Sequence, residues 1–596
     1  MVFSSLLIAN RGEIAVRIAR ACTEAGIRSV AVYSPEDRDA MHVRVADEAF
    51  ALPGQTASDT YLNPAAIVAV ALKAGADAVH PGYGFLAESA ELAQAAGRAG
   101  LIWIGPSPAA LELVSNKVSA RALAARAGVS MVPASDGPVD SAADVERFGA
   151  EYGYPLVIKA CYGGGGRGMR VVESAVQAGP ALATCQRESQ AAFGRPECFV
   201  ELFLARPRHV ETQCLADAQG TVAVVSTRDC TVQRRHQKLV EEAPAPFLSP
   251  DQDERLRSAS RALLTKAAYT GAATCEFLVS AAGEVFFMEI NPRLQVEHPV
   301  TEEVTGVDLV REQLRIAAGE ELGYTDVLAY GHAIEFRINA EDPANGFLPS
   351  PGMIRSLRLP GGPGVRCDFG YEAGDALTGS YDSLIGKVIV RGRDRAQALA
   401  RGRRALAELK VEGVGTVKHF HRTVLEDPTF TAAAPGQFTV HTRWVDTDFA
   451  PVVAALPPAT ALDPELPPVP ATSRMIVEVG GKRLEVVLPA PLAGSAVASP
   501  ATGPAAPLAP RRTPKKTAGS RGGRTSSGSV VAPMQGTVVR VAVAEGDSVA
   551  EGDLVVVLEA MKMEQPLTAP RAGTVTKLNA EPGQRVSSGH LLGVVQ

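Results

Sequence analysis

Short apolar runs alternate with amphipathic helical patterns along the first part of the chain. Residues 6–9 and 29–33 are apolar runs typical of strands, and residues 13–25 between them have the spacing of a helix with one apolar face. Residues 78–84 and 102–106 repeat the unit of a short strand followed by a turn. This alternation predicts a parallel sheet with helices on both faces. No Gly-x-Gly-x-x-Gly turn follows the first strand, which disfavours a dinucleotide site.

Mixed helical and strand patterns continue to about residue 448, and the pattern then changes. Residues 475–487 alternate apolar and polar side chains on both sides of Gly480-Gly481, which predicts a β-hairpin. This hairpin is too short to be stable alone.

Residues 490–527 are rich in Ala, Pro, Ser and Gly and contain the basic pairs Arg511-Arg512 and Lys515-Lys516. Such a composition cannot bury enough apolar surface to fold. We therefore expect a flexible tether with a reach of roughly 35 Å. A nucleic-acid-binding arm is the less favoured alternative, because no aromatic residues lie between the basic ones.

The C-terminal residues 530–596 contain one motif twice, as APMQGTVVRVAVAEGDSVAEGDLV and APRAGTVTKLNAEPGQRVSSGHLL. In both copies short apolar strands are separated by glycine turns. The duplication predicts a small, quasi-symmetric β-sandwich. Lys562 lies between the halves, at a turn where a side chain must protrude.

Composition narrows the class of protein. The 596 residues correspond to about four domains, and 46% apolar and 21% charged residues are ordinary for a globular protein. A net charge of −6 gives no reason to expect nucleic acid or an anionic membrane as a partner. No apolar run is long enough to span a bilayer. The N-terminus lacks the basic start of a signal peptide, and we interpret it as a buried strand. The eight cysteines form no CxxC pair, which fits a reducing cytosol.

Two polar clusters carry candidate chemistry. Residues 163–168 are a glycine run after an apolar strand, which suits phosphate binding, although a plain surface loop has the same pattern. Further on, Glu276 lies in one strand-like run, and Glu289 and Asn291 alternate onto one side of the next. Two carboxylates and an amide oxygen suit Mg²⁺ that carries ATP phosphates. Charged residues follow directly, at positions 293–298, and would be costly to bury without ligands.

The C-terminal motif, with EAMKM around Lys562, resembles the biotinyl/lipoyl carrier domain over residues 528–596. Methionines on both sides of the lysine are typical of the biotin form. The resemblance implies covalent biotin on Lys562. A biotin arm on a tethered domain raises the local concentration of biotin at two distant sites.

Residues 1–448 resemble biotin carboxylase, an ATP-grasp enzyme. The matching strings are IANRGEIAVRIARA, HPGYGFLAE, IKACYGGGGRGMRVV, RDCTVQRRHQKLVEEAPAP, EINPRLQVEHPVTEEVTG, FRINAEDP and YDSLIGK. The implied fold is multidomain α/β. It has a Rossmann-like pre-ATP-grasp domain (1–115), an ATP-grasp domain (116–330) with a lid at about 132–205, an α+β C-terminal domain (331–448), a β-rich docking segment (449–490), the linker (491–527) and the all-β carrier domain (528–596).

The resemblance also implies roles for single residues. ATP would contact Lys117, Lys159, Gly165, Gly166, Glu201, Leu204, His209, Gln233, His236 and Glu276. Mg²⁺ or Mn²⁺ would be held by Glu276, Glu289 and Asn291. Bicarbonate would bind Lys238, Arg293, Gln295 and Val296. Glu297 would be the base that deprotonates bicarbonate, and Arg337 would stabilise the biotin enolate. The predicted catalytic residues are Lys238, Arg293, Glu297 and Arg337.

Two residues depart from the family pattern near the sites: Pro292 stands where Thr is frequent, and Tyr162 replaces a small residue. Cys230 lies near the predicted bicarbonate pocket, where a small buried residue is favoured over a nucleophile.

The whole chain resembles the α subunit of actinobacterial acyl-CoA carboxylases. The implied partners are a separate carboxyltransferase β subunit, in a hetero-oligomeric complex, and a biotin protein ligase, with the cytoplasm as the compartment. Alternatives are a non-catalytic carrier with a degenerate ATP-grasp body, which the intact polar set disfavours, and the α subunit of a methylcrotonyl-CoA-type carboxylase. The acyl acceptor cannot be read from this chain.

Overall fold

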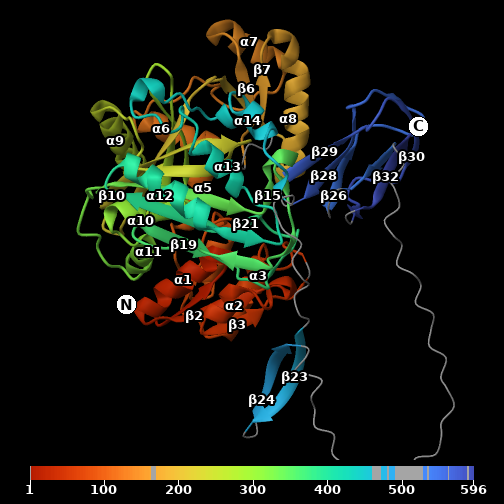
Figure 1. Ribbon diagram of the computed structural model, residues 1–596. Coiled ribbons are helices and arrows are strands. Elements are labelled where there is room, and N and C mark those ends of the chain that lie inside the picture. Colours follow the sequence, from red (N-terminus) through yellow and green to blue (C-terminus); the bar gives the residue numbers. More distant parts are fainter. Residues whose placement is uncertain are drawn as a thin grey trace, which may run out of the picture. The chain divides into compact units, whose positions relative to one another are not determined.

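The computed structural model describes residues 2–54, 56–162, 169–459, 472–479, 482–489, 528–532, 536–560, 563–586 and 589–596. The chain divides into two compact units, Met1–Leu462 and Asp463–Gln596 (Figure 1). The glycine run at 163–168, the predicted tether at 491–527 and the predicted biotin acceptor Lys562 lie outside the described residues.

The N-terminal part of the first unit is a parallel sheet covered on both faces, as predicted. Its strand order is β3-β2-β1-β4-β5. Leu6 and Ile8 of β1 pack on one side against α1, whereas Leu7 packs on the other side among residues of α3 and α4. The bounds are β1 (Ser5–Ile8), α1 (Gly12–Ala25), β2 (Arg28–Tyr33), α2 (Met41–Val45), β3 (Glu48–Ala51), α3 (Pro64–Lys73), β4 (Ala78–His80), α4 (Ala90–Arg98) and β5 (Ile102–Trp103).

An eight-stranded sheet forms the centre of the first unit, with the order β13-β12-β9-β10-β11-β14-β21-β19 and antiparallel pairs throughout. Its strands are β9 (Arg208–Ala216), β10 (Val222–Arg234), β11 (Gln237–Ala243), β12 (Gly271–Val279), β13 (Val285–Asn291), β14 (His332–Asn339), β19 (Val365–Phe369) and β21 (Leu384–Gly392). The predicted boundary between residues 330 and 331 therefore separates strands of one continuous sheet. Residues on both sides of it share a hydrophobic core.

Helices pack around this sheet and the N-terminal sheet. They are α5 (Pro108–Ser115), α6 (Lys117–Arg126), α9 (Pro250–Lys266), α10 (His298–Thr305), α11 (Leu309–Ala317), α12 (Arg395–Glu408), α13 (Lys418–Val424) and α14 (Ala450–Ala454). Short strand pairs finish the C-terminal part: β15 (Glu341–Asp342) with β16 (Leu348–Pro349), β17 (Gly352–Met353) with β20 (Ala376–Leu377), and β18 (Ser356–Arg358) with β22 (Lys410–Glu412). None of the described helices is long and apolar enough to cross a membrane.

A smaller sheet projects at one end of the first unit (Figure 1). It has the order β7-β6-β8 and a core of its own with the two helices beside it. This region coincides with the predicted lid. Its elements are α7 (Ala142–Tyr152), β6 (Leu156–Ala160), β7 (Met169–Val172), α8 (Ala178–Phe193) and β8 (Cys198–Leu202).

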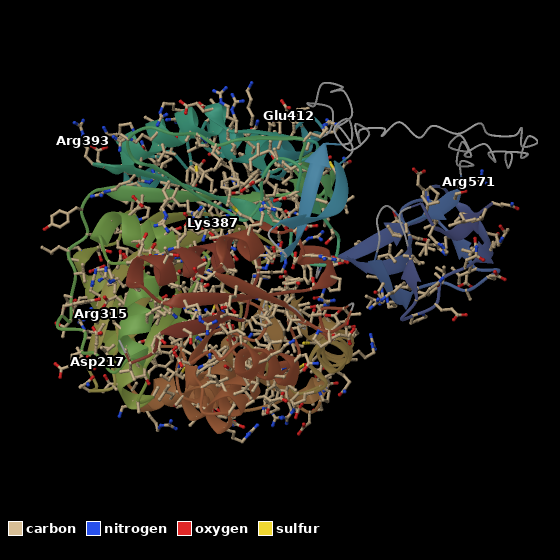
Figure 2. The ribbon with its side chains drawn as sticks, turned by 90° about the horizontal axis from the view of Figure 1, so that it is seen from below. Asp217, Arg315, Lys387, Arg393, Glu412 and Arg571 are labelled. Atoms are coloured by element: carbon tan, nitrogen blue, oxygen red, sulfur yellow. The ribbon has the colours of Figure 1, made fainter. Side chains whose placement is uncertain are left out.

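A buried lysine ties the N-terminal sheet to the eight-stranded sheet. Lys387 of β21 has no exposed side-chain surface, and Figure 2 shows it inside the unit, in contrast to Arg393 and Glu412. Its Nζ lies 3.0 Å from Glu13 of α1 and donates to the carbonyl of Val296 at 2.9 Å. A buried charge is tolerated when it is paired and hydrogen-bonded in this way.

The C-terminal residues 528–596 form two four-stranded sheets that enclose one core, which confirms the predicted β-sandwich. The strands are β25 (Ser529–Val531), β26 (Gly536–Val541), β27 (Ser548–Val549), β28 (Leu554–Ala560), β29 (Met563–Thr568), β30 (Gly573–Leu578), β31 (Arg585–Val586) and β32 (Leu591–Val595). One sheet has the order β25-β32-β30-β27 and the other β29-β28-β26-β31. Replacing each strand by its counterpart in the other half of the sequence converts one order into the other, so the duplicated motif makes a two-fold structure.

The second unit also contains the predicted hairpin. β23 (Thr472–Val479) pairs with β24 (Lys482–Pro489) over eight residue pairs, from Thr472–Pro489 to Val479–Lys482. The turn residues Gly480 and Gly481 lie outside the described residues.

The aromatic cluster around Phe420 offers a test of the C-terminal core. Phe420 is fully buried and contacts Phe347 and Phe449, and Trp444 stacks on Phe449 at 4.3 Å. We expect Phe420→Ala to lower the free energy of unfolding by about 3–5 kcal/mol, because it leaves a cavity. The chain has two tryptophans, so urea unfolding followed by fluorescence in a Trp103→Phe background reports on Trp444 alone. Leu328→Ala, at a side chain that is 73% exposed, is the control and should change stability by less than about 0.5 kcal/mol. Equal effects of the two changes would contradict the described packing.

Candidate active site

Neighbouring strands align a row of acidic side chains across the eight-stranded sheet. In the β9–β12 pair Glu211 lies opposite Glu276, and in the β12–β13 pair Glu276 lies opposite Glu289. Directly opposed strand residues project from the same face of a sheet. Three carboxyl groups from three strands therefore meet on one surface, two of them nearly or fully buried.

Lys238 of β11 neutralises this acidic surface. Its Nζ donates to Glu211 Oε2 at 2.6 Å, to Glu276 Oε1 at 2.9 Å and to Glu297 Oε1 at 2.7 Å. Burial alone would lower the pKa of Lys238, but the surrounding negative charge raises it well above its usual value. Lys238 is therefore a permanent cation bound by three carboxylates.

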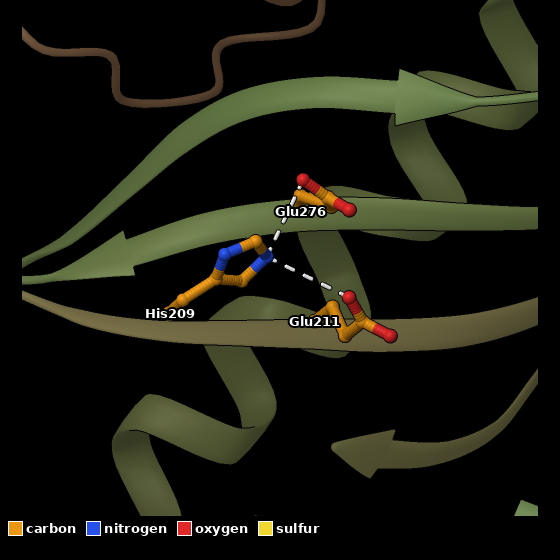
Figure 3. A group of neighbouring side chains, drawn as sticks. All are labelled: His209, Glu211 and Glu276. Atoms are coloured by element: carbon orange, nitrogen blue, oxygen red, sulfur yellow. Dashed lines mark ion pairs between the residues drawn. The ribbon is translucent and has the colours of Figure 1, made fainter. Parts of the chain in front are cut away.

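His209 adds a second positive charge beside the same carboxylates (Figure 3). Its Nε2 lies 3.3 Å from Glu276 and 3.6 Å from Glu211. Burial opposes protonation, but Glu276 raises the pKa of His209 to about 9. These three side chains are close enough to hold a metal ion. The ammonium group of Lys238 already supplies a cation to both carboxylates, so we do not interpret this group as a metal centre.

Arg228 supports Glu211 from beneath the site. It is fully buried and donates from Nε to Glu211 Oε1 at 2.5 Å and from Nη1 to Gln213 Oε1 at 2.6 Å. Two threonine hydroxyl groups accept its remaining bonds. Sequence reasoning missed both Arg228 and Glu211. A signal was present, because His209, Glu211 and Gln213 alternate along one strand and so share a face.

Glu297 precedes α10 and is fully buried between two cations. Besides the bond from Lys238, its Oε2 accepts from Arg337 Nη2 at 2.9 Å. Burial would raise its pKa, but Lys238 and then Arg337 lower it. Glu297 is therefore ionised at neutral pH, as a general base must be. The Cys230 thiol lies 3.7 Å from Glu297 Oε1, and burial raises its pKa well above the usual value, which fits a neutral buried residue.

The three predicted metal ligands lie together on β12 and β13. Glu289 is partly buried, and burial raises the pKa of its carboxyl group. The nearest cation to it is Lys117, at 3.9 Å. The amide nitrogen of Asn291 is buried without a hydrogen-bond partner, while its oxygen accepts from Arg293. Carboxylate and amide oxygen atoms are the ligands that Mg²⁺ prefers, and Glu289 lies 3.9 Å from its nearest cation, so the donor set fits Mg²⁺.

The predicted bicarbonate residues follow β13. Arg293 donates from Nε to Glu88 at 2.7 Å and from Nη1 to Gln295 Oε1 at 3.0 Å. The carbonyl group of Val296 accepts from the buried Lys387. Gln295 also donates to Glu276 at 3.3 Å. The structure thus brings these residues beside Lys238 and Glu297.

The predicted nucleotide residues come from the lid and from the eight-stranded sheet. Lys159 of β6 forms an ion pair with Glu201 of β8, and Arg121 lies 3.6 Å from the same carboxyl group. Gln233 donates to the Cys230 carbonyl. His236 has a positive φ of 66° in the turn after β10, and burial lowers its pKa to about 4. Leu204 is the second residue after the end of β8. Gly165 and Gly166 lie outside the described residues.

Family models match four successive parts of the chain. They are the biotin carboxylase N-terminal domain at residues 2–111, the carbamoyl-phosphate synthase L chain ATP-binding domain at 116–325, the biotin carboxylase C-terminal domain at 335–447 and the biotin-requiring enzyme model at 528–595.

Known proteins resemble the chain over most of its length. The biotin-dependent acyl-coenzyme A carboxylase alpha3 subunit of Mycobacterium leprae is 51% identical over 95% of this chain and 94% of its own. Biotin carboxylase of a Nostoc strain is 48% identical over 72% of this chain and 97% of its own. The biotin carboxylase domain of Hydrogenobacter thermophilus 2-oxoglutarate carboxylase, solved with MgADP and bicarbonate, is 41% identical, covers 77% of this chain and all of its own, and superposes with a TM-score of 0.74.

The ATP-binding domain between the two biotin carboxylase domains, and the biotin domain that follows, together define a biotin-dependent ligase. The chain belongs to the biotin carboxylase family, in the α-subunit form that joins the carboxylase to a biotinyl domain. Its cofactors are covalent biotin and a divalent cation bound with ATP.

The central position of Lys238 leads to a prediction on stability. Lys238→Met would leave three buried carboxyl groups without their shared cation, and we expect a loss of about 3–5 kcal/mol near neutral pH. The pKa values of these groups would then rise above those of the unfolded chain. While these carboxyl groups are protonated, they do not destabilise the folded variant. As the pH rises through their folded-state pKa values, this stability is lost, so the variant should recover stability on acidification.

The measurement is urea unfolding of the parent and the variant in EDTA at about pH 5.5 and about pH 7.5. Lys238→Arg keeps the positive charge and is the control. A loss in Lys238→Met that is the same at both pH values would contradict the arrangement.

Proposed function

We propose that the chain carboxylates the biotin on its own carrier domain, with ATP and bicarbonate, as the α subunit of an acyl-CoA carboxylase. The observation that carries this proposal is the buried Glu297, held ionised between Lys238 and Arg337. A base fixed between cations is suited to an anionic substrate, because fixed cations attract bicarbonate and stabilise the transition state.

The nucleotide would lie between the lid and the sheet. Lys117, Lys159, Gly165 and Gly166 would contact its phosphates, while the adenosine part would contact the remaining residues: Glu201, Leu204, His209, Gln233 and His236. In this structure Lys159 pairs with Glu201, and Lys117 lies nearest Glu289. When a nucleotide binds, both lysines would leave these carboxylates and pair with phosphate oxygens. The positive charge of the lysines and the negative charge of the phosphates favour this exchange.

Phosphoryl transfer consists mainly of positioning and charge neutralisation. Glu276, Glu289 and Asn291 would hold Mg²⁺ or Mn²⁺, which when bound neutralises the phosphate oxygens. Lys238, Arg293, Gln295 and the Val296 backbone would orient bicarbonate. Glu297 would take the proton of bicarbonate. An oxygen atom of bicarbonate would attack the γ-phosphorus of ATP while the bond from that phosphorus to ADP breaks, which gives carboxyphosphate and ADP.

The second half of the reaction would take place beside Arg337. Carboxyphosphate would break into carbon dioxide and phosphate, and this phosphate would take the proton of the ureido nitrogen. That nitrogen would then attack carbon dioxide, which forms the C–N bond of carboxybiotin. Arg337 would stabilise the negative charge that develops on the ureido oxygen when the proton leaves. An arginine suits this task because its guanidinium group stays protonated; the nearby carboxylates raise the pKa of Arg337 further, against the effect of burial.

We propose Lys562 as the acceptor of biotin, attached by a biotin protein ligase. The strands that flank it end at Ala560 and begin at Met563. A separate carboxyltransferase β subunit would transfer the carboxyl group to an acyl-CoA, as the name of the Mycobacterium leprae relative suggests. The compartment we propose is the cytoplasm, since all eight cysteines are free thiols.

Loss of the base provides a direct test. Glu297→Gln should abolish bicarbonate-dependent ATP hydrolysis stimulated by free biotin, because nothing then removes the bicarbonate proton. Phosphate release is the measurement. Lys562→Arg is the matched variant: it should lose covalent biotin, detected by streptavidin blot, yet still carboxylate free biotin. Unchanged turnover in Glu297→Gln would defeat the assignment.

The β23–β24 hairpin is the segment that we propose to dock the β subunit. An exposed strand edge can pair with a partner's strand. Deleting residues 472–490 should prevent co-purification of the carboxyltransferase while free-biotin carboxylation persists. Full complex formation by the deletion variant would rule out the hairpin as the docking element. A panel of acyl-CoAs with the purified complex would identify the acceptor.

A further inference from the structure

Two buried carboxyl groups lie behind Arg337, and the mechanism above does not use them. Glu241 of β11 and Glu335 of β14 are directly opposed in the antiparallel ladder and fully buried. Glu241 Oε1 accepts from Arg337 Nε at 2.6 Å. The other oxygen of Glu241 and both oxygens of Glu335 are buried without a hydrogen-bond partner among the described residues.

The cations around this pair cannot neutralise both carboxyl groups. Lys387, opposite Arg337 on β21, is engaged by Glu13 and the Val296 carbonyl. Arg337 is shared with Glu297, and Lys238 of β11 is bound by three other carboxylates. Two adjacent buried carboxyl groups of this kind are not both ionised. Burial raises the pKa of Glu241 to about 7 and that of Glu335 well above its usual value, so Glu335 is the group that retains the proton.

We propose that protonated Glu335 donates a hydrogen bond to the free oxygen of Glu241, and that this acid–carboxylate pair is the anchor that positions Arg337 for the biotin half of the reaction. Glu241 and Glu335 are positioning residues, since they act through Arg337. This inference rests on the role proposed above for Arg337.

The geometry of Arg337 explains why an anchor is needed. Its Nε is bound by Glu241 and its Nη2 by Glu297, while Nη1 has no partner among the described residues. The side chain is 16% exposed. Two bonds to two separate carboxyl groups fix the orientation of the planar guanidinium group, so Nη1 is directed at one place, where the ureido oxygen can bind. With Glu297 alone, the group could rotate about a single bond.

The test compares the two half-reactions in the full chain. A Lys562→Arg background removes the internal acceptor, and bicarbonate-dependent phosphate release is then measured with and without free biotin. Glu241→Gln removes the anionic anchor, and we expect the ratio of biotin-stimulated to biotin-independent rate to fall about tenfold or more, the loss of one hydrogen bond to a charged group. The KM for biotin should rise.

Two substitutions of Glu335 show whether this residue acts as a hydrogen-bond donor or through a negative charge. Glu335→Gln keeps a neutral donor of the same shape and should retain the parent ratio. Glu335→Leu keeps the volume but has no donor, and its ratio should fall as in Glu241→Gln. Equal losses in Glu335→Gln and Glu335→Leu would overturn the proposal, because they would mean that the negative charge of Glu335 is what matters.

Control variants separate this inference from a structural effect and from the proposed function. Glu242, the next residue, pairs with Arg395 and His332; Glu242→Gln should keep the parent ratio even if it lowers stability. A proportional loss of both rates in Glu241→Gln would indicate a structural role and defeat the proposal. If Arg337→Gln does not lower the ratio, the role of Arg337 itself is wrong. If Arg337→Gln lowers the ratio and Glu241→Gln does not, only the anchor is wrong.

Discussion

The active site depends on one ammonium group that three buried carboxylates share. Lys238 binds Glu211, Glu276 and Glu297 at once, and each of these carboxylates comes from a different part of the fold: β9, β12 and the start of α10. Isolated charges in such a place would cost several kcal/mol each. Paired, they keep Glu297 ionised and oriented. The long strands, the buried Arg228 and the packing of α10 against the sheet all serve to keep this group together.

The sequence allowed the local elements to be predicted well. The fully buried β1 was visible as an apolar run, α1 as a helical spacing, and the carrier domain as a duplication, because each of these signals is contained within a few neighbouring residues. The predicted catalytic set came from resemblance to a family, and the structure brings Lys238, Arg293, Glu297 and Arg337 close together. Their roles are still proposals.

Long-range pairing could not be predicted from these patterns. Nothing in the residues near 330 indicates that β11 pairs with β14, so that one sheet continues across the predicted boundary. Glu211, Arg228 and Glu335 were likewise not singled out. Their significance arises from partners that are distant in sequence and become neighbours only through strand register.

The two-fold symmetry of the carrier domain has a consequence for access. The exchange of halves maps the β28–β29 hairpin onto the pair formed by β32 and β25, where the chain leaves and enters the domain. In Figure 1 the hairpin and the C-terminus lie at different ends of this domain. The β28–β29 end of the domain is thus opposite the end formed by β25 and β32. The position proposed for biotin therefore lies at the end where a compact domain can be inserted into an active site with its own two ends remaining outside.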